Sequence, residues 1–290
     1  MFHRALVADE AAELLAVRAA EGGGGVEHPL RRTDSLVGLV QGGPTMKEAR
    51  YFYVPQAGQR DELPSEEARH AVRVLRLVEG DEIFLIDGAG SFLRCTITLA
   101  APHHCAYRVE ETQAQQPTWR GHIHLSIAPT IYMGRMEWMA EKATEVGWDE
   151  VSFLDTQFSE RRSLRADRID KIVVAAMKQS RKAWKPVVNE MVSFRAFVDA
   201  HQEGRRFICH CYPEIARQDF FDAITAPQGD AAGASDDITV LVGPEGDFSV
   251  EEVRYALDRG YESVSLGKSR LRTETAGLTA VVMAQLARRR

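Results

Sequence analysis

The sequence predicts an α/β protein in which a small β-rich domain precedes a larger domain built on a parallel sheet. Beyond residue 119, short apolar stretches alternate with stretches of helical period, and this alternation is typical of a parallel sheet with helices on both faces. Between residues 50 and 115, four strand-like stretches surround one helical stretch, which is typical of a compact barrel. A polar linker, Gln113–Thr118, contains Pro117 and separates the two patterns.

The small domain is predicted from alternating apolar and polar residues and from one clear turn. Its four expected strands are Tyr51–Val54, Glu82–Ile86, Phe92–Leu99 and Tyr107–Val109. Asp87–Gly90 has the composition of a turn between two of these strands. One helix is expected over Ser65–Leu77.

The larger domain is predicted from β-branched runs that each lead toward a helical pattern. The expected strands are His122–Ile127, Val151–Leu154, Phe207–Cys211, Ile238–Val242 and Ser263–Leu266. Helices are expected over Arg135–Val146, within Arg165–Trp184, after Ser249 and over Thr273–Leu286. Ser249 and Glu252 have the spacing of a capping box, and Thr273 is predicted to be the N-cap of the last helix.

Two glycine-bearing loops, Leu241–Ser249 and Leu266–Ala276, follow neighbouring strands of this domain. Such loops are where an α/β sheet usually holds a small ligand. Neither loop contains G-x-x-x-x-G-K-[ST] or G-x-G-x-x-G, so the usual nucleotide cofactors are not predicted. Glycine required only by strand-to-helix turn geometry is the alternative interpretation.

Composition indicates an ordinary globular protein rather than a uniformly basic one. The 290 residues are 44% hydrophobic and 27% charged, with a formal net charge of −6. No apolar run is long enough to cross a bilayer, and the N-terminus lacks a secretory pattern, so a cytoplasmic location is expected. Local basic clusters with helical spacing, at Arg73/Arg76 and at 178–185, are candidates for phosphate contact.

No metal site is predicted. The four cysteines, Cys95, Cys105, Cys209 and Cys211, form no C-x-x-C pair. A zinc site built from the segments 103–105 and 209–211 would not match the usual ligand spacing. Reduced and mostly buried thiols are therefore expected.

The first 45 residues differ from the rest of the chain. They contain a run of four glycines, Gly22–Gly25, and a polar glycine-bearing segment up to Thr45. This composition predicts a disordered or non-native N-terminal extension. Met46 is then the expected start of the native chain.

Several motifs, in order along the chain, resemble the bacterial ribosomal RNA small subunit methyltransferase E family of the SPOUT superfamily. The most specific are Gly243-Pro-Glu-Gly246 with Phe248-Ser249, and Leu271-Arg-Thr-Glu-Thr-Ala276. Three upstream segments also match, namely His70–Arg76, Glu141–Gly147 and Ala176–Arg181. The resemblance extends from Met46 to the C-terminus. It departs at Asp247, where the family usually carries a second glycine.

The resemblance implies both a fold and a function. It implies a PUA-like RNA-binding β-barrel over 46–115 and a methyltransferase domain with a trefoil knot over 119–290. The implied activity is methylation of N3 of a specific uridine in 16S ribosomal RNA, with S-adenosylmethionine as donor. The implied partners are 16S ribosomal RNA or the small ribosomal subunit and a second copy of the chain, because dimerisation completes the family's active site. An inactive RNA-binding or assembly factor, and a SPOUT methyltransferase acting on another RNA position, are the alternatives.

The resemblance also implies binding residues. Three loops are expected to hold the cofactor mainly through backbone groups: Cys211, Pro213, Leu241, Gly243, Pro244, Glu245, Gly246, Leu266, Gly267, Leu271 and Thr273. Contact with RNA is expected from Arg50, His70, Arg76, Gln179 and Arg181. For His70, a helix histidine with a satisfied local hydrogen bond is the competing interpretation.

Arg272 and Glu274 are the candidate catalytic residues. The uridine N3–H is a weak acid and is hidden by base pairing, so the base must be unpaired or flipped and must lose a proton. Glu274 and Glu245 are the carboxylates that could accept it, and Arg272 could stabilise the negative charge on the uracil oxygens. Alternatively, Glu274 only interacts favourably with the helix dipole.

Overall fold

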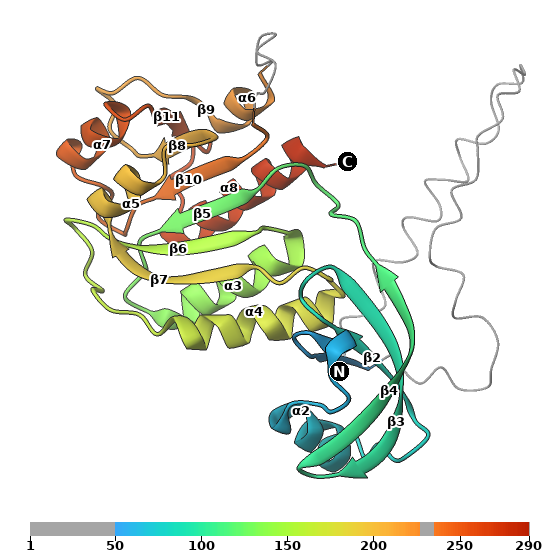
Figure 1. Ribbon diagram of the computed structural model, residues 1–290. Coiled ribbons are helices and arrows are strands. Elements are labelled where there is room, and N and C mark those ends of the chain that lie inside the picture. Colours follow the sequence, from blue (N-terminus) through green and yellow to red (C-terminus); the bar gives the residue numbers. More distant parts are fainter. Residues whose placement is uncertain (1–49, 227–234, 290) are drawn as a thin grey trace, which may run out of the picture. The chain divides into compact units, whose positions relative to one another are not determined.

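The computed structural model describes residues 50–226 and 235–289 (Figure 1). This part of the chain forms a four-stranded sheet followed by a seven-stranded sheet. The predicted α/β class with a parallel sheet is confirmed. The expected N-terminal extension over 1–45 and the expected start at Met46 lie outside the described residues.

The four-stranded sheet has the order β1-β2-β3-β4. Its strands are β1 (Tyr51–Tyr53), β2 (Glu82–Ile86), β3 (Ser91–Ala101) and β4 (His104–Ala114). The β3–β4 hairpin is longer than predicted. Most residues of β4 beyond Tyr107 are exposed or half-buried, so the apolar alternation that marks a strand fades there although the antiparallel pairing continues to Ala114.

The helix predicted over Ser65–Leu77 is shorter and changes its winding. It comprises α2 (Ser65–Arg69) and a π-helical turn, η3 (His70–Val74), and a short 3-10 turn, η2 (Ala57–Gln59), precedes it. Ala68 and Ala71 are fully buried in the core of the small sheet. The arginines of the same segment remain exposed.

All neighbouring strands of the seven-stranded sheet run parallel, in the order β7-β6-β5-β10-β8-β11-β9. The strands are β5 (Ile123–Ile127), β6 (Glu150–Asp155), β7 (Val187–Ser193), β8 (Arg205–Cys209), β9 (Gln218–Asp219), β10 (Ile238–Val242) and β11 (Glu262–Ser265). The sequence pattern missed β7 and β9. Both lie at the sheet's edges and have no fully buried residue, so they lack an apolar run.

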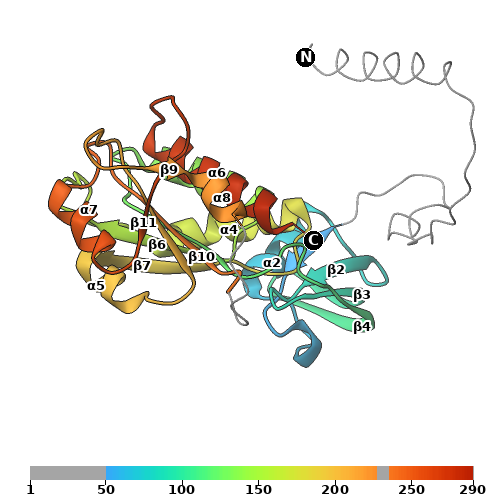
Figure 2. The ribbon, with the colours of Figure 1, turned by 90° about the horizontal axis from the view of Figure 1, so that it is seen from above.

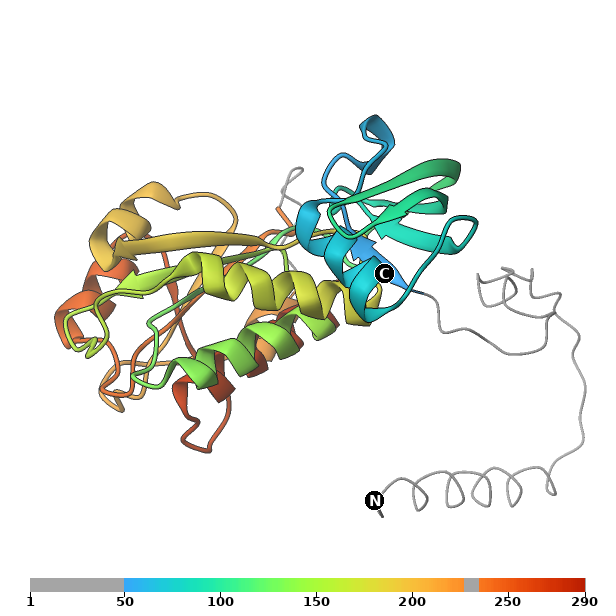
Figure 3. The same ribbon diagram turned by 90° about the horizontal axis from the view of Figure 1, so that it is seen from below.

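Helices cover both faces of this sheet. One face packs against α3 (Met133–Val146), α4 (Ala166–Ser180), α6 (Phe220–Thr225) and α8 (Thr273–Arg288). The other face packs against α5 (Phe194–Ala200) and α7 (Val250–Leu257). Figure 3 shows α3, α4 and α8 on the same face. Alternate residues of β10 serve the two faces, with Val240 in one core and Leu241 in the other.

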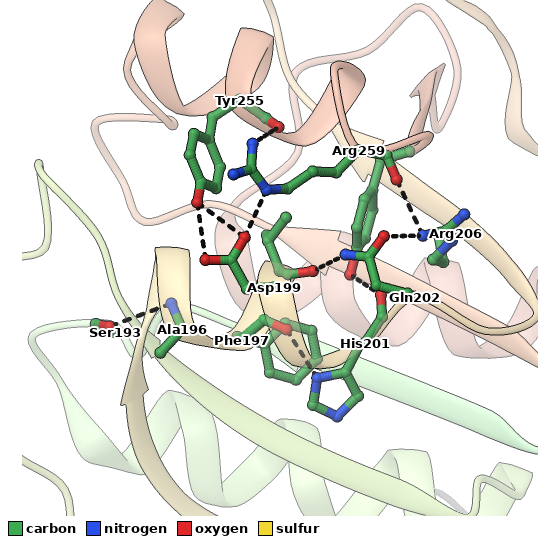
Figure 4. A network of polar contacts seen from close by, with 11 residues as sticks. Ser193, Ala196, Phe197, Asp199, His201, Gln202, Arg206, Tyr255 and Arg259 are labelled. Carbon is green, nitrogen blue, oxygen red and sulfur yellow. Dashed lines mark hydrogen bonds and ion pairs between the residues drawn. The ribbon is translucent and has the colours of Figure 1, made fainter.

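A polar network joins α5 to α7 on the second face (Figure 4). The Asp199 carboxylate accepts hydrogen bonds from the Tyr255 hydroxyl, at 2.8 and 2.9 Å, and from the Arg259 guanidinium. The Tyr255 ring also lies 3.4 Å from the Arg259 guanidinium carbon and 4.2 Å from that of Arg195. These contacts fix the helix that follows the loop 243–248.

Candidate functional site

The three loops predicted to hold the cofactor lie at the carboxyl ends of strands of the parallel sheet. They follow β8, β10 and β11, and β8 pairs with both of the other strands. Because neighbouring parallel strands have their carboxyl ends on the same side of a sheet, the three loops emerge side by side. The loop before α8 projects beyond the sheet (Figure 2), and Gly267 in it is exposed with φ +119°.

The loop 243–248 folds back on itself in a tight turn. The Asp247 N–H donates to the Pro244 carbonyl at 3.0 Å. A Cβ on Gly243 would lie 3.0 Å from the Phe248 nitrogen, so this close approach favours glycine. The predicted capping box at Ser249 and Glu252 is present and starts α7 directly after the turn.

Side chains also fasten this loop to its neighbours. Glu245 Oε1 accepts a hydrogen bond from the Ile131 N–H at 3.2 Å. Glu252 Oε1 accepts one from the Gln157 N–H at 2.8 Å. The Asp247 carboxylate accepts the N–H of Cys211 at 2.7 Å. The loops after β5, β6 and β8 are thus all tied to the segment after β10.

A cavity of about 640 Å³ opens between the start of α3 and the start of α8. From the loop and α8 it is lined by Arg270, Leu271, Arg272, Glu274 and Thr275, and from the α3 side by Gly134, Arg135 and Trp138. The structure therefore brings the two candidate catalytic residues, Arg272 and Glu274, together. Sequence reasoning missed Arg135 and Trp138, because their place beside Glu274 depends on the packing of α3 against α8 and no local motif signals it.

Glu274 is buried, with 7% of its surface exposed. Its Oε1 lies 3.7 Å from Arg135 Nε. Its Oε2 is buried and has no hydrogen-bond partner among the residues that the structure describes. An unpartnered buried carboxylate oxygen is costly unless a ligand supplies a donor, so Glu274, which also lines the cavity, is a candidate acceptor for the hydrogen-bond donor of a ligand.

The start of α8 differs by one residue from the prediction. Arg272, not Thr273, occupies the N-cap position, and its side chain makes no capping hydrogen bond. Thr273 is the first helical residue and is buried. The prediction of Thr273 as N-cap was wrong because Arg272 already has the extended backbone of a cap residue, with ψ 155°.

The cysteines are free thiols. Cys95 and Cys105 are buried, as expected, whereas Cys211 is exposed and Cys209 is intermediate. Burial raises the pKa of Cys95 to about 12, and burial together with Asp247 raises the pKa of Cys211. A thiol with a raised pKa is a poor nucleophile, so the pKa of Cys211 does not favour a reactive thiolate at this position.

The predicted RNA-contacting residues lie around the small sheet and at the end of α4. Arg50 directly precedes β1, His70 starts the π-helical turn, and Arg76 is exposed with φ +55°. Gln179 is exposed in the last turn of α4. Arg181 follows that helix, with its guanidinium carbon 5.4 Å from the centroid of the Tyr51 ring.

The basic cluster expected over 178–185 is largely engaged in contacts of its own. Lys178 pairs with Glu67 at 2.6 Å, and Lys185 pairs with Asp170. Burial lowers the pKa of Lys182. The helical spacing suggested a free basic face for phosphate binding, but the contacts of these lysines leave less of it available. Arg181 is the exposed cation of the cluster.

Comparison with protein families adds independent evidence. A model described as an RNA methyltransferase domain matches residues 117–285, which contain the whole seven-stranded sheet and the cavity. This chain belongs to the RNA methyltransferase family. A second model, an RNA methyltransferase PUA domain, matches residues 63–109 within the small sheet. The family thus accounts for both halves of the described chain.

Individual relatives indicate which group of RNA methyltransferases this chain resembles. Ribosomal RNA small subunit methyltransferase E of Rickettsia conorii is 26% identical over 227 residues, covering 78% of this chain and 89% of the relative. A crystal structure of a probable rRNA-methyltransferase from Porphyromonas gingivalis aligns with a TM-score of 0.70 and 41% identity, covering 80% of this chain and 95% of that one. The resemblance to the ribosomal RNA small subunit methyltransferase E family is confirmed.

A third relative has a known ligand. Ribosomal RNA small subunit methyltransferase E of Neisseria gonorrhoeae was solved bound to S-adenosyl methionine. It aligns with a TM-score of 0.69 and 25% identity, covering 82% of this chain and 97% of that one.

The present protein has no metal site in the part of the chain that the structure describes. Among its residues 50–226 and 235–289, no cluster of three or more His, Cys, Asp or Glu is arranged to hold a metal ion. No helix within the same ranges is long and apolar enough to cross a membrane.

Proposed function

We propose that this protein methylates N3 of a specific uridine in 16S ribosomal RNA, with S-adenosylmethionine as the methyl donor. The observation that carries the proposal is the cavity at the start of α8, which Arg272 and Glu274 both line. The Oε2 oxygen of Glu274 is buried and has no hydrogen-bond partner among the described residues. Uracil N3–H is a hydrogen-bond donor flanked by two carbonyl oxygens. A carboxylate acceptor and a guanidinium that line one cavity can complement that edge of the base.

S-adenosylmethionine would be held by the three loops at the carboxyl ends of β8, β10 and β11. Gly243 is buried and packs closely on the Phe248 backbone, whereas Gly246 and Gly267 are exposed and leave their backbone groups bare. Bare backbone groups suit recognition of an adenine and a ribose. Bound there, S-adenosylmethionine supplies an electrophilic methyl group on a positive sulfonium.

The residues of the chain would then control the proton and the charge. Glu274 Oε2 accepts the N3 proton as the nitrogen becomes nucleophilic. Arg272 stabilises the negative charge that develops on the uracil oxygens. Arg135, 3.7 Å from Glu274 Oε1, keeps the carboxylate oriented. Positioning alone can supply roughly 7–11 kcal/mol of the barrier reduction.

The RNA must present an unpaired or flipped uridine to this cavity. We assign the RNA-binding barrel to 46–115 and the methyltransferase domain to 119–290, with Arg50, His70, Arg76, Gln179 and Arg181 as contacts to the RNA. Exposed cations at Arg76 and Arg181 support this assignment. Such contacts make affinity depend steeply on salt concentration.

The proposal extends to the knot and the dimer of the resembled family. The order β10-β8-β11, in which β8 lies between two strands that follow it in sequence, supports a trefoil knot at the cofactor loops. Trp138 of α3 and Leu286 of α8 are 44% and 48% exposed. Large exposed apolar side chains on two packed helices support an interface with a second copy.

Methyl transfer to RNA in vitro tests the proposal. Purified protein is incubated with methyl-labelled S-adenosylmethionine and small ribosomal subunits that lack the modification, and the RNA is digested to nucleosides. The expected labelled product is N3-methyluridine. Label in a ribose-methylated nucleoside would favour a methyltransferase that acts on another RNA position. If S-adenosylmethionine binds but no label enters the RNA, the inactive RNA-binding or assembly factor is favoured.

A further inference from the structure

Asp247 is the residue at which this chain departs from the family motif, and its backbone is unusual. Its φ is +68°, in the left-handed region that residues with a Cβ rarely adopt. Glycine adopts that conformation without cost, whereas aspartate is only one of the more tolerant alternatives. A residue that accepts such strain within the loop 243–248 is expected to repay it through its side chain.

The Asp247 side chain makes two hydrogen bonds to backbone groups. Oδ2 accepts from the Cys211 N–H at 2.7 Å, across 36 positions of sequence. Oδ1 accepts from the neighbouring Phe248 N–H at 2.8 Å. Bonds to an ionised acceptor are roughly twice as strong as neutral ones. The carboxylate thus joins the loop after β8 to the loop after β10.

A second contact joins the same two loops. The Tyr212 hydroxyl donates to the Phe248 carbonyl at 2.7 Å. Arg217 Nη1 donates to the His210 carbonyl at 2.6 Å, which supports the loop after β8 from its other end. The connection between the loops is therefore a small network in which Asp247 contributes the carboxylate.

We propose that Asp247 is a positioning residue that holds the Cys211 and Gly243–Gly246 loops in the arrangement that binds S-adenosylmethionine. This inference rests on the proposed function, because the ligand of these loops belongs to that proposal. Loops already joined before the ligand arrives lose less conformational freedom on binding. A glycine at position 247 would ease the backbone but could not join the loops.

Calorimetry on the full chain tests the inference, with S-adenosylmethionine and S-adenosylhomocysteine as ligands. Asp247→Gly keeps the backbone conformation and removes the carboxylate, and is expected to weaken both affinities about tenfold. Asp247→Asn keeps an acceptor oxygen and is expected to lie between Asp247→Gly and wild type. Asp258→Asn, an exposed carboxylate just after α7, is the charge-matched control and should bind like wild type. Asp247→Gly that binds both ligands as tightly as wild type would overturn the inference.

Kinetics distinguish positioning from a general loss of structure. In Asp247→Gly the KM for the donor should rise about tenfold, while the KM for RNA and the melting temperature change little. A fall in kcat together with a lower melting temperature, at unchanged donor KM, would contradict a positioning role.

Hydrogen exchange in the ligand-free protein separates this inference from the proposed function. The Cys211 and Phe248 amides should exchange at least tenfold faster in Asp247→Gly than in wild type. Unchanged exchange overturns the link between the loops whatever the ligand. If exchange accelerates as expected but wild type binds neither ligand, the proposed function fails while the structural link stands.

Discussion

At the scale of residues, Glu274 has two competing interpretations, one catalytic and one structural. It stands in the first turn of α8, where a carboxylate interacts favourably with the helix dipole. A dipole role would be satisfied by an exposed carboxylate, and Glu274 is instead buried with one oxygen unpartnered in the part of the chain that the structure describes. Burial of that kind favours a role in binding or catalysis.

Replacing Glu274 with glutamine tests that role. Glu274→Gln removes the proton acceptor while conserving shape, so the single-turnover rate of methyl transfer should fall about 10²- to 10⁴-fold. Binding of the donor, measured by calorimetry, should stay within a factor of three.

The matched control is Glu251→Gln, which removes an exposed first-turn carboxylate from α7. It should leave the rate unchanged. A Glu274→Gln enzyme with the wild-type single-turnover rate would exclude Glu274 as the base.

The sequence predicted this site unevenly, and the reason lies in individual residues. Arg272 and Glu274 were predicted because they belong to a continuous motif, and the structure places both at one cavity. Arg135 and Trp138 were missed because they lie on another helix, more than 130 positions away from Arg272. The role of Asp247 was also beyond prediction, since its bond to Cys211 depends on strands that pair in three dimensions.

At the scale of elements, the start of α7 fixes the loop that precedes it. Ser249 Oγ accepts from the Glu252 N–H at 3.2 Å, and Glu252 Oε2 accepts from the Ser249 N–H at 2.9 Å. Both residues are buried. The capping box was predictable because it depends only on local spacing.

Ser249→Ala removes this cap and is expected to lower the free energy of unfolding by about 1 kcal/mol. Urea denaturation followed by circular dichroism measures the change. Ser193→Ala at the start of α5 is the comparison, because its bond to the Ala196 N–H is long at 3.4 Å and its loss should cost less. An equal or larger loss in Ser193→Ala would contradict this ranking of the two caps.

At the scale of the whole molecule, local pattern predicted a strand-rich small domain and a parallel sheet, but not the order of the strands. Alternating strands and helices predict a parallel sheet, yet β10 lies between β5 and β8 although many residues separate it from β5 in sequence. Pairing between distant strands leaves no mark on the spacing of apolar residues. The edge strands β7 and β9 were missed for the opposite reason, since their exposure removes the apolar run itself.

A buried polar group gives the whole fold a predicted pH dependence. Burial lowers the pKa of His124 to about 4 from its ordinary 6.5, against the opposing effect of Glu150. His124 Nε2 lies 2.9 Å from Ser152 Oγ, and its ring packs 5.2 Å from that of His201. The neighbouring His122 has a raised pKa through its bond to Glu150.

The sign follows from proton uptake by the unfolded chain. An unfolded His124 binds a proton below about pH 6.5 while the folded one stays neutral until about pH 4, so stability is complete above 6.5 and is lost as the pH falls between these values. The loss approaches about 3 kcal/mol. Glu150, with a pKa lowered to about 2 chiefly by its bond to His122, adds a loss of the same sign below about pH 4.5. His122 opposes both, since its stabilisation is complete below about 6.5 and is lost as the pH rises.

Melting temperatures between pH 7 and pH 4.5 check this expectation. His124→Gln cannot gain a proton and should show a flatter dependence than wild type. His103→Gln, which changes an exposed histidine in the turn between β3 and β4, is the comparison for the same substitution outside the core. Parallel curves for wild type and His124→Gln would contradict the assignment.

The proposed activity of the enzyme is the methylation of one uridine of 16S ribosomal RNA in the cell. The most direct measurement is the mapping of N3-methyluridine in 16S RNA from cells with the gene, without it, and complemented with wild type or Glu274→Gln. One N3-methyluridine is expected to disappear with the gene, to return with wild type and not to return with Glu274→Gln. An N3-methyluridine signal that is unchanged without the gene would contradict the proposed activity.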